Sequence, residues 1–157
     1  MRTGERAAGI ILKDNKILVF RRVKGNRCYH AFIGGGIEVG ETPDQAIMRE
    51  IKEEASVNIN KCRLLFRVKT KLDEAYIGSE IKRFSPLQHF YLITNFEGTP
   101  KLGGPEKERA CESNQYHFEW IPLEKISETK DLYPNEAREK LVEYIKLGKL
   151  RRENYGK

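Results

Sequence analysis

Apolar and polar positions alternate in short runs at the start of the chain. Ala7–Leu12 is apolar, Lys13–Lys16 is polar, and Ile17–Phe20 is apolar again. Two short apolar runs joined by a polar turn are typical of a β-hairpin. We expect further strands at Tyr29–Ile33, Arg63–Thr70, Gln88–Thr94 and Tyr116–Ile121.

Two other segments carry helical signals. Thr42 is suited to be an N-cap, Pro43 to the first helical position, and Gln45 to completing a capping box. This predicts a helix from Pro43 to about Ala55. A second helix is expected from Pro134 to about Leu147, where apolar residues recur at helical spacing. Strands interleaved with helices predict a mixed α/β domain.

The size of the chain fits one domain. It has 157 residues, of which 39% are hydrophobic, enough for a sizeable core. We expect a single domain over residues 1–157, with its core at about 5–147 and a basic tail at 148–157 that frays. No stretch approaches 18 apolar residues, so no membrane span is expected.

Charge and cysteine content narrow the choice of partners and compartment. The formal net charge is +6, which favours acidic partners such as phosphates and nucleotides. The three cysteines, Cys28, Cys62 and Cys111, are widely spaced and odd in number. A disulfide framework or a zinc site is therefore not expected, and a reduced, cytoplasmic protein is the natural interpretation.

The first predicted helix gathers acidic side chains. On a helical wheel, Ala46, Arg49, Glu50, Glu53 and Glu54 fill one arc. The next arc is apolar and is formed by Ile47, Met48, Ile51 and Ala55. Two carboxylates about 5 Å apart repel by roughly 3 kcal/mol at an effective dielectric near 20. Arg49 offsets part of this repulsion through an i,i+4 contact with Glu53. What remains is relieved by solvation or by a hard cation such as Mg²⁺ or Mn²⁺.

Taken alone, such an acidic stripe is more often a solvated helix face than a metal site. The preceding Gly34, Gly35 and Gly36 change this balance. Three consecutive glycines are costly in conformational entropy and are expected to break regular structure where the backbone approaches a ligand. Gly35 could then offer its carbonyl to a metal, and neighbouring N–H groups such as that of Gly36 could face phosphate oxygens.

The segment GGIEVGETPDQAIMREIKEEASV resembles the Nudix box of the MutT-type Nudix hydrolases. Gly35 opens the pattern, Glu41 follows after five residues, and Arg49-Glu50-Ile51 after seven more. Glu53, Glu54 and Val57 also stand where the pattern requires them. Two positions depart from it: Ser56 replaces a glycine that ends the helix, and Ile33 replaces a frequent proline. If Ser56 keeps the left-handed conformation, it should cost about 1 kcal/mol.

The resemblance implies a Nudix-like α/β/α sandwich around a mixed sheet. It also implies metal-dependent hydrolysis of a diphosphate linkage in a nucleoside triphosphate or a nucleoside diphosphate derivative. Divalent ions would neutralise the substrate and orient the attacking water. By position in the box, the implied ligands of Mg²⁺ or Mn²⁺ are Gly35, Glu50, Glu53 and Glu54. Glu53 is our first choice for general base, and Arg49 is expected to orient a box glutamate.

Several residues outside the box are candidates for lesser roles. Glu106 and Glu112 are alternative general bases, although each is more often a plain surface glutamate. Arg21 and Arg22 end a predicted strand and could hold substrate phosphates, but strand alternation lets only one of them point inward. The aromatic candidates for base stacking are Tyr29, Phe32, Phe84 and Tyr91, each more often a core residue. The histidines, at positions 30, 89 and 117, have no ligand-like spacing and are expected to be structural.

Two other functions stay open at this point. One is a Nudix-fold sensor that binds a nucleotide without hydrolysing it, which the retained carboxylates disfavour. The other is an RNA-directed protein, which the charge and the basic tail allow. The sequence shows no aromatic-rich RNA-binding motif, so a nucleic-acid partner is ranked lower. A homodimer is possible.

Overall fold

The computed structural model describes residues 2–70, 74–77, 80–83, 87–103 and 111–150. Most of its strands form one mixed sheet, with the order β10-β3-β2-β1-β8-β5. In addition, β4 pairs with β1, and β9 pairs with β2. The strands of this sheet are β1 (Arg2–Lys13), β2 (Lys16–Lys24), β3 (Arg27–Ala31), β4 (Ile33–Glu38), β5 (Asn58–Lys69), β8 (Leu87–Glu97), β9 (Asn114–Pro122) and β10 (Leu132–Tyr133). β6 (Glu74–Ile77) and β7 (Glu80–Arg83) form a separate antiparallel hairpin.

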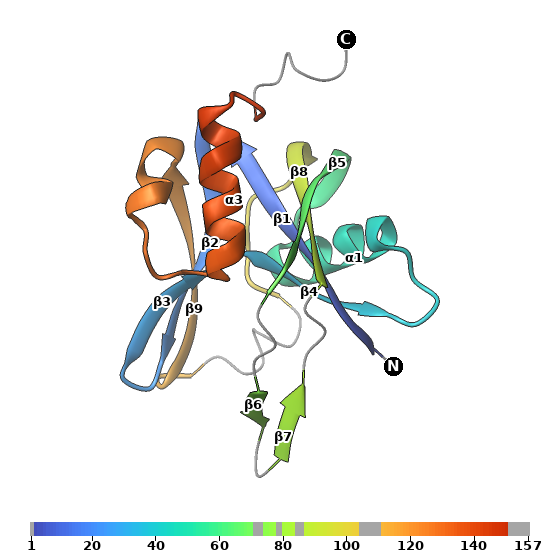
Figure 1. The fold of residues 1–157 in the computed structure, drawn as a ribbon, viewed down its shortest axis with the longest axis vertical. Coiled ribbons are helices and arrows are strands. Elements are labelled where there is room, and N and C mark those ends of the chain that lie inside the picture. Colours follow the sequence, from blue (N-terminus) through green and yellow to red (C-terminus); the bar gives the residue numbers. More distant parts are fainter. Residues whose placement is uncertain (1, 71–73, 78–79, 84–86, 104–110, 151–157) are drawn as a thin grey trace.

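Helices cover the two sides of the sheet, as Figure 1 shows with α3 in front of it. α1 (Pro43–Ala55) packs through Ile47 and Ile51 on one side, in a core cluster that also contains Leu18 and Phe20 of β2. α3 (Asn135–Lys146) packs through Leu141 on the other side, together with the short 3₁₀ helix η1 (Leu123–Glu128). This is the predicted α/β/α arrangement around a mixed sheet. We call the two sides of the sheet the α1 side and the α3 side.

β1 lies in the middle of this arrangement because it has three partners. One edge pairs in parallel with β8 over Arg6–Ile11. The other edge pairs with β4 near its beginning and with β2 near its end. The β1–β2 turn has Asp14 and Asn15 with φ of 52° and 60°. Two positive φ values in succession are typical of the tight hairpin turn that the polar residues predicted.

Several predicted elements are confirmed and others need correction. The first helix has its predicted bounds, with both hydrogen bonds of the Thr42–Gln45 capping box present. The second helix, α3, begins and ends within one residue of its predicted bounds. The predicted strand Tyr29–Ile33 is extended as expected but not continuous, because β3 ends at Ala31 and β4 begins at Ile33. The tail prediction was wrong for Leu150, which packs in the core on the α3 side.

The glycines predicted to break regular structure lie instead within strand β4. None of the three has a positive φ, so they are not needed for unusual dihedrals. Gly34 is required for close approach: a Cβ there would lie 2.2 Å from the carbonyl oxygen of Ala7 on the paired strand β1. The glycines therefore let β4 sit tightly between β1 and α1.

Candidate metal and active site

The site is built where α1 crosses strand β4, on the α1 side of the sheet. Helix periodicity turns Glu50 and Glu54 inward, where they are 1% and 8% exposed. Glu53 faces outward, with 45% of its side chain exposed. The helical-wheel assignment was wrong at two positions: Ala46 is buried and Met48 is exposed. The acidic stripe is thus partly buried, which a merely solvated helix face would not be.

Gly35 makes the space that the buried Glu50 carboxylate occupies. A Cβ on Gly35 would lie 2.3 Å from Oε2 of Glu50, far inside contact distance. A bare strand backbone and a buried carboxylate therefore lie directly against each other. Burying a carboxylate is unfavourable unless cations or hydrogen-bond donors compensate its charge. The protein supplies part of that compensation through Arg49.

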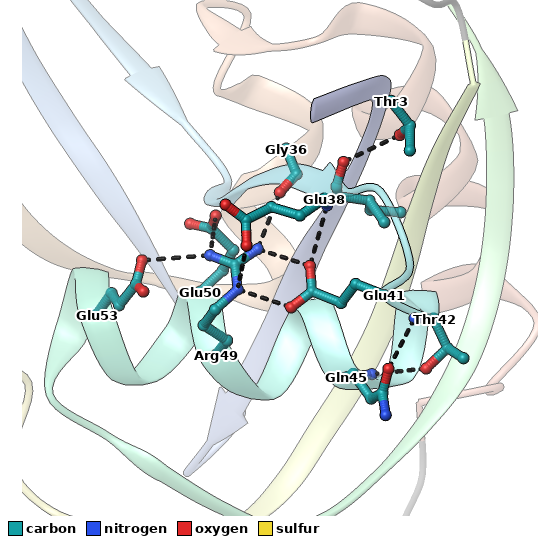
Figure 2. Close-up of polar contacts among 10 residues, drawn as sticks. Thr3, Gly36, Glu38, Glu41, Thr42, Gln45, Arg49, Glu50 and Glu53 are labelled. Carbon is teal, nitrogen blue, oxygen red and sulfur yellow. Dashed lines mark hydrogen bonds and ion pairs between the residues drawn. The ribbon is translucent and has the colours of Figure 1, made fainter. Parts of the chain in front are cut away.

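Arg49 connects the carboxylates of this site, as Figure 2 shows. Its Nε and Nη2 donate to the two oxygens of Glu41 at 2.7 and 2.8 Å. Nη1 donates to Glu50 at 2.9 Å and to Glu53 at 3.3 Å. Nη2 also donates to the carbonyl oxygen of Gly36 at 3.1 Å. The hydrogen bond to Glu41 is the main cause of the raised pKa of Arg49, which stays charged.

These contacts place Arg49 among the glutamates, with Glu41 as its main partner. In the sequence, Glu41 has a position in the box pattern but no assigned role. The signal that could have found the pair was the position of Glu41 immediately before the capping box, eight residues or about two helical turns before Arg49. The predicted i,i+4 contact between Arg49 and Glu53 is confirmed.

The carboxylates fit a divalent cation by type. Oxygen donors from glutamates and a backbone carbonyl are what Mg²⁺ and Mn²⁺ prefer. Within the described ranges, however, no three acidic, histidine or cysteine side chains already converge as a ready-made metal site. The present contacts instead direct oxygens of Glu50 and Glu53 to Arg49. The donor set therefore fits the ion, and Arg49 holds its members in place.

The two candidate arginines of β2 lie on opposite sides of the sheet. Leu18 and Phe20 face α1, so strand alternation places Arg22 on the α1 side and Arg21 on the α3 side. Arg21 approaches Glu119 at 3.7 Å. Arg22 stacks on Tyr116 with its guanidinium carbon 3.7 Å from the ring centroid. The arginine that shares the side of the box glutamates is thus Arg22.

Arg22 is held in a fixed orientation. Its Nη2 donates to the side-chain oxygen of Asn114, and its Nε donates to the carbonyl of Gln115 at 3.3 Å. No carboxylate of the described residues forms an ion pair with it. Asn114 and Tyr116 are functional candidates that sequence reasoning missed, because they are more than 90 residues from Arg22 in the chain.

Most other candidates have structural surroundings. Phe32 and Tyr91 are buried, and Tyr91 donates a hydrogen bond to Asp44 of α1. Tyr29 is half-buried, and Glu112 is exposed in the turn before β9. Phe84 and Glu106 lie outside the described residues.

Each histidine is hydrogen-bonded within the fold. His30 contacts Asp131 at 2.8 Å and Glu119 at 3.2 Å, and His117 contacts Gln115. Arg67 Nε donates to Nδ1 of His89, so Nε2 of that ring carries the proton that faces Glu5. These contacts agree with the structural role predicted for the histidines.

Comparison with known proteins agrees with this geometry. The NUDIX domain family model matches residues 3–143. The chain belongs to the NUDIX family. It is therefore a Nudix-type hydrolase of a diphosphate linkage in a nucleotide derivative, from a family that generally uses a divalent metal. Within the described part of the chain, no helix combines the length and apolarity needed to cross a bilayer.

The share of a relative's length that the chain matches differs from one relative to the next. An 8-oxo-dGTP diphosphatase of Proteus vulgaris is 34% identical over 102 residues, which cover 62% of this chain and 83% of the relative. An NAD-capped RNA hydrolase NudC of Salmonella paratyphi C is 25% identical over 113 residues; the match covers 72% of this chain and only 38% of that protein. A solved MutT protein of Methanosarcina mazei Go1 has a TM-score of 0.66 at 17% identity, covering 92% of this chain and 94% of that one. That likeness shows the fold.

Proposed function

We propose that this chain is a Mg²⁺- or Mn²⁺-dependent pyrophosphohydrolase whose metal is held by Glu50, Glu53, Glu54 and the carbonyl of Gly35. The observation that carries the proposal is the buried Glu50 carboxylate lying against a strand position that has no side chain. A bound divalent ion would offset the negative charge of the diphosphate and lower the pKa of a bound water.

The protein's own residues divide the remaining tasks. Of the two α1 glutamates that Arg49 contacts, Glu53 is far more exposed than Glu50, so it is the one better placed to take a proton from water. Arg49 positions Glu50 and Glu53 and keeps its charge throughout. Arg22 presents an oriented guanidinium that can bind a phosphate through the donors left over from Asn114 and Gln115.

A cavity of about 390 Å³ beside the site is our candidate for the nucleoside part of the substrate. It lies between the start of α3 and the ends of several strands, and its lining includes Arg6, Gln88, Tyr133 and Asn135. The volume lies in the range of small-ligand sites, and the lining mixes aromatic with hydrogen-bonding groups. Arg6 also donates to the carbonyl of Gly34 at 3.5 Å, next to Gly35. Arg6 thus connects the cavity with the strand that carries Gly35.

The test is phosphate or nucleotide release across a substrate panel with Mg²⁺, with Mn²⁺ and with EDTA. The panel holds nucleoside triphosphates, 8-oxo-dGTP, ADP-ribose, a nucleotide sugar, a dinucleotide and NAD-capped RNA, since relatives bear names for some of these activities. Glu53→Gln should lower kcat by about 10²-fold or more, the scale of a lost general base. Glu143→Gln, an exposed glutamate on α3, is the matched control and should behave as wild type.

The same panel distinguishes a hydrolase from a nucleotide-binding sensor. A sensor would bind a panel member in calorimetry but release no product from any of them. If Glu53→Gln turns over the best substrate as fast as wild type, Glu53 is not the base. If no metal binds to wild type in the presence of a substrate analogue, the assigned ligand set is wrong.

A further inference from the structure

Strands β3, β2 and β9 form a three-stranded ribbon that extends beyond α1. Arg22 pairs with Tyr29 of β3 and with Tyr116 of β9, and Phe20 pairs with Phe118. Because paired residues of neighbouring strands share a side, all of these project toward the α1 side. The exposed Arg27 belongs with them, since its guanidinium lies 5.1 Å from the Tyr29 ring. We call this surface the aromatic–arginine face; it consists of Arg22, Arg27, Tyr29, Tyr116, Phe118 and Tyr133.

Charge is distributed unequally between the two sides of this ribbon. On the α1 side, the strand positions of β2, β3 and β9 include Lys16, Lys24 and the two arginines, and none is Asp or Glu. On the α3 side, Glu119 of β9 contacts both Arg21 and His30. The acidic partners of the ribbon therefore lie on the side away from the aromatic–arginine face. This face is complementary to a polyanion.

The rings on this face are arranged to receive flat ligands. Tyr116 meets Phe20 edge-on, and Phe118 stacks on Phe20 at a centroid distance of 5.3 Å, so both rings are supported from below. They remain half-buried, whereas Phe20 is fully covered. The guanidinium of Arg22 lies over the Tyr116 ring and adds a planar cation to the face. Supported aromatic rings interleaved with arginine planes are the features that bind unpaired bases, by stacking, and their phosphates, by charge.

The face is continuous with the cavity beside the candidate metal site. Tyr133 is 42% exposed and lines that cavity. Its ring meets the Tyr29 ring edge-on at 6.1 Å. The cavity is lined by the start of α3, and Tyr133 belongs to β10, which ends the strand order next to β3. A ligand that fills the cavity could therefore continue around this edge of the sheet, over Tyr133 and Tyr29.

We propose that the aromatic–arginine face binds an unpaired run of nucleotides, several residues long. No aromatic-rich motif is visible along the sequence, and for that reason a nucleic-acid partner was ranked lower. The fold supplies one by bringing together β3 and β9, which are far apart in the chain. The face needs no metal for this binding, so it can be tested apart from hydrolysis.

The experiment is fluorescence anisotropy in EDTA with a labelled, unstructured oligoribonucleotide of about 12 nucleotides, within the usual site sizes. The oligonucleotide carries a 5′-hydroxyl, so it offers no diphosphate to the metal site. Binding should weaken with added salt, with a slope of about −0.7 per phosphate contacted. Inorganic polyphosphate of similar charge should compete weakly, because it has no bases to stack.

Two variants test the contributions of charge and of base stacking separately. Lys24→Gln/Arg27→Gln should reduce the salt slope by about 1.4, the value for two lost phosphate contacts. Tyr29→Leu should weaken binding by about 5- to 150-fold, the range for one lost base stack, with little change in salt slope. The control is Lys125→Gln/Lys130→Gln, which removes the same charge from exposed positions around η1 and should bind as wild type. Circular dichroism and Tm confirm that each variant is folded.

Three outcomes would overturn the proposal: no binding by wild type, equal losses in the Lys125/Lys130 control, or competition by polyphosphate as strong as by unlabelled oligonucleotide. The last would show a nonspecific polyanion surface. None of them bears on the proposed hydrolase, whose test uses small nucleotides and metal.

Discussion

The guanidinium of Arg49 donates hydrogen bonds to both carboxylate oxygens of Glu41, at 2.7 and 2.8 Å. This paired contact joins the middle of α1 to the loop that precedes it. Its remaining donors reach Glu50, Glu53 and the Gly36 carbonyl, so one side chain fixes the turn, the helix and strand β4 relative to one another. Lysine has a single ammonium and cannot reproduce this geometry.

Arg49→Lys should therefore lower the free energy of unfolding by about 2 kcal/mol, the scale of lost hydrogen bonds to charged groups. Urea denaturation measures it. The matched control is Lys52→Arg, which exchanges the same residue types at an exposed position of the same helix. It should stay within about 0.5 kcal/mol of wild type. Equal stability of the two variants would mean that the Arg49–Glu41 contact contributes little.

Gly35→Ala should damage metal binding more than folding. The added methyl group would lie 2.3 Å from Oε2 of Glu50, which must swing away from its place against the strand. Calorimetry with Mn²⁺ should show affinity falling by about tenfold or more, since a displaced carboxylate loses one ligand interaction, worth at least 1.4 kcal/mol.

Gly34→Ala is the informative comparison for that variant. Its methyl group would meet backbone, 2.2 Å from the Ala7 carbonyl oxygen and 2.6 Å from the Ala8 Cα, and backbone cannot swing aside. We expect destabilisation of about 3 kcal/mol or more by thermal or urea unfolding. The explanation of the glycines would be wrong if Gly34→Ala were stable and Gly35→Ala unfolded.

Ser56→Gly should stabilise the protein. Ser56 ends α1 with φ of 58° and ψ of 32°, the left-handed conformation predicted for this position. A side chain costs about 1 kcal/mol there, so glycine should raise Tm by about 2–4 °C for a chain of this size. Asn15→Gly serves as control: Asn15 has φ of 60°, but asparagine tolerates this region, so the gain should be smaller. A lower Tm for Ser56→Gly would show that the serine hydroxyl has an unrecognised contact.

Tyr91 should make stability fall at high pH. Burial, and secondly the hydrogen bond to Asp44, raise the pKa of this phenol above its ordinary value of 10.0. The folded state therefore keeps a proton that the unfolded state loses above about pH 10. Stability is fully retained below that pH and declines above it, by up to about 1.4 kcal/mol per pH unit.

Tyr91→Phe isolates this effect. Urea midpoints are measured from pH 8 to 11 and expressed relative to each protein's own value at pH 8. They should fall less steeply with pH for Tyr91→Phe than for wild type. Tyr144→Phe, on α3 and half-buried, is the comparison for a tyrosine on the other side of the sheet. Parallel curves for Tyr91→Phe and wild type would contradict the assignment.

What could be predicted from the sequence was whatever depends on near neighbours. The start of α1 follows from Thr42, Pro43 and Gln45, three adjacent signals, and its bounds were correct. The β1–β2 turn is likewise local. The family motif then supplied the fold and the reaction class, because its fixed positions lie within a single segment.

What could not be predicted depends on distant contacts. Glycine normally indicates backbone freedom, yet Gly34 and Gly35 are needed because Ala7 and Glu50 approach them from other elements. The orientation of Arg22 depends on Asn114 and Gln115, far along the chain. That residues 1–157 form a single domain, and that a homodimer is possible, stay predictions.

The three partners of β1 have a consequence for how the molecule opens. Detaching this strand would break its ladders with β2, β4 and β8 together, so partial opening through the middle of the sheet is strongly disfavoured. Amide protons of β1 should then exchange with solvent only through global unfolding, and those of β4 opposite it should follow at the same rate. The backbone beneath the glutamates would thus be among the last parts of the protein to open to solvent.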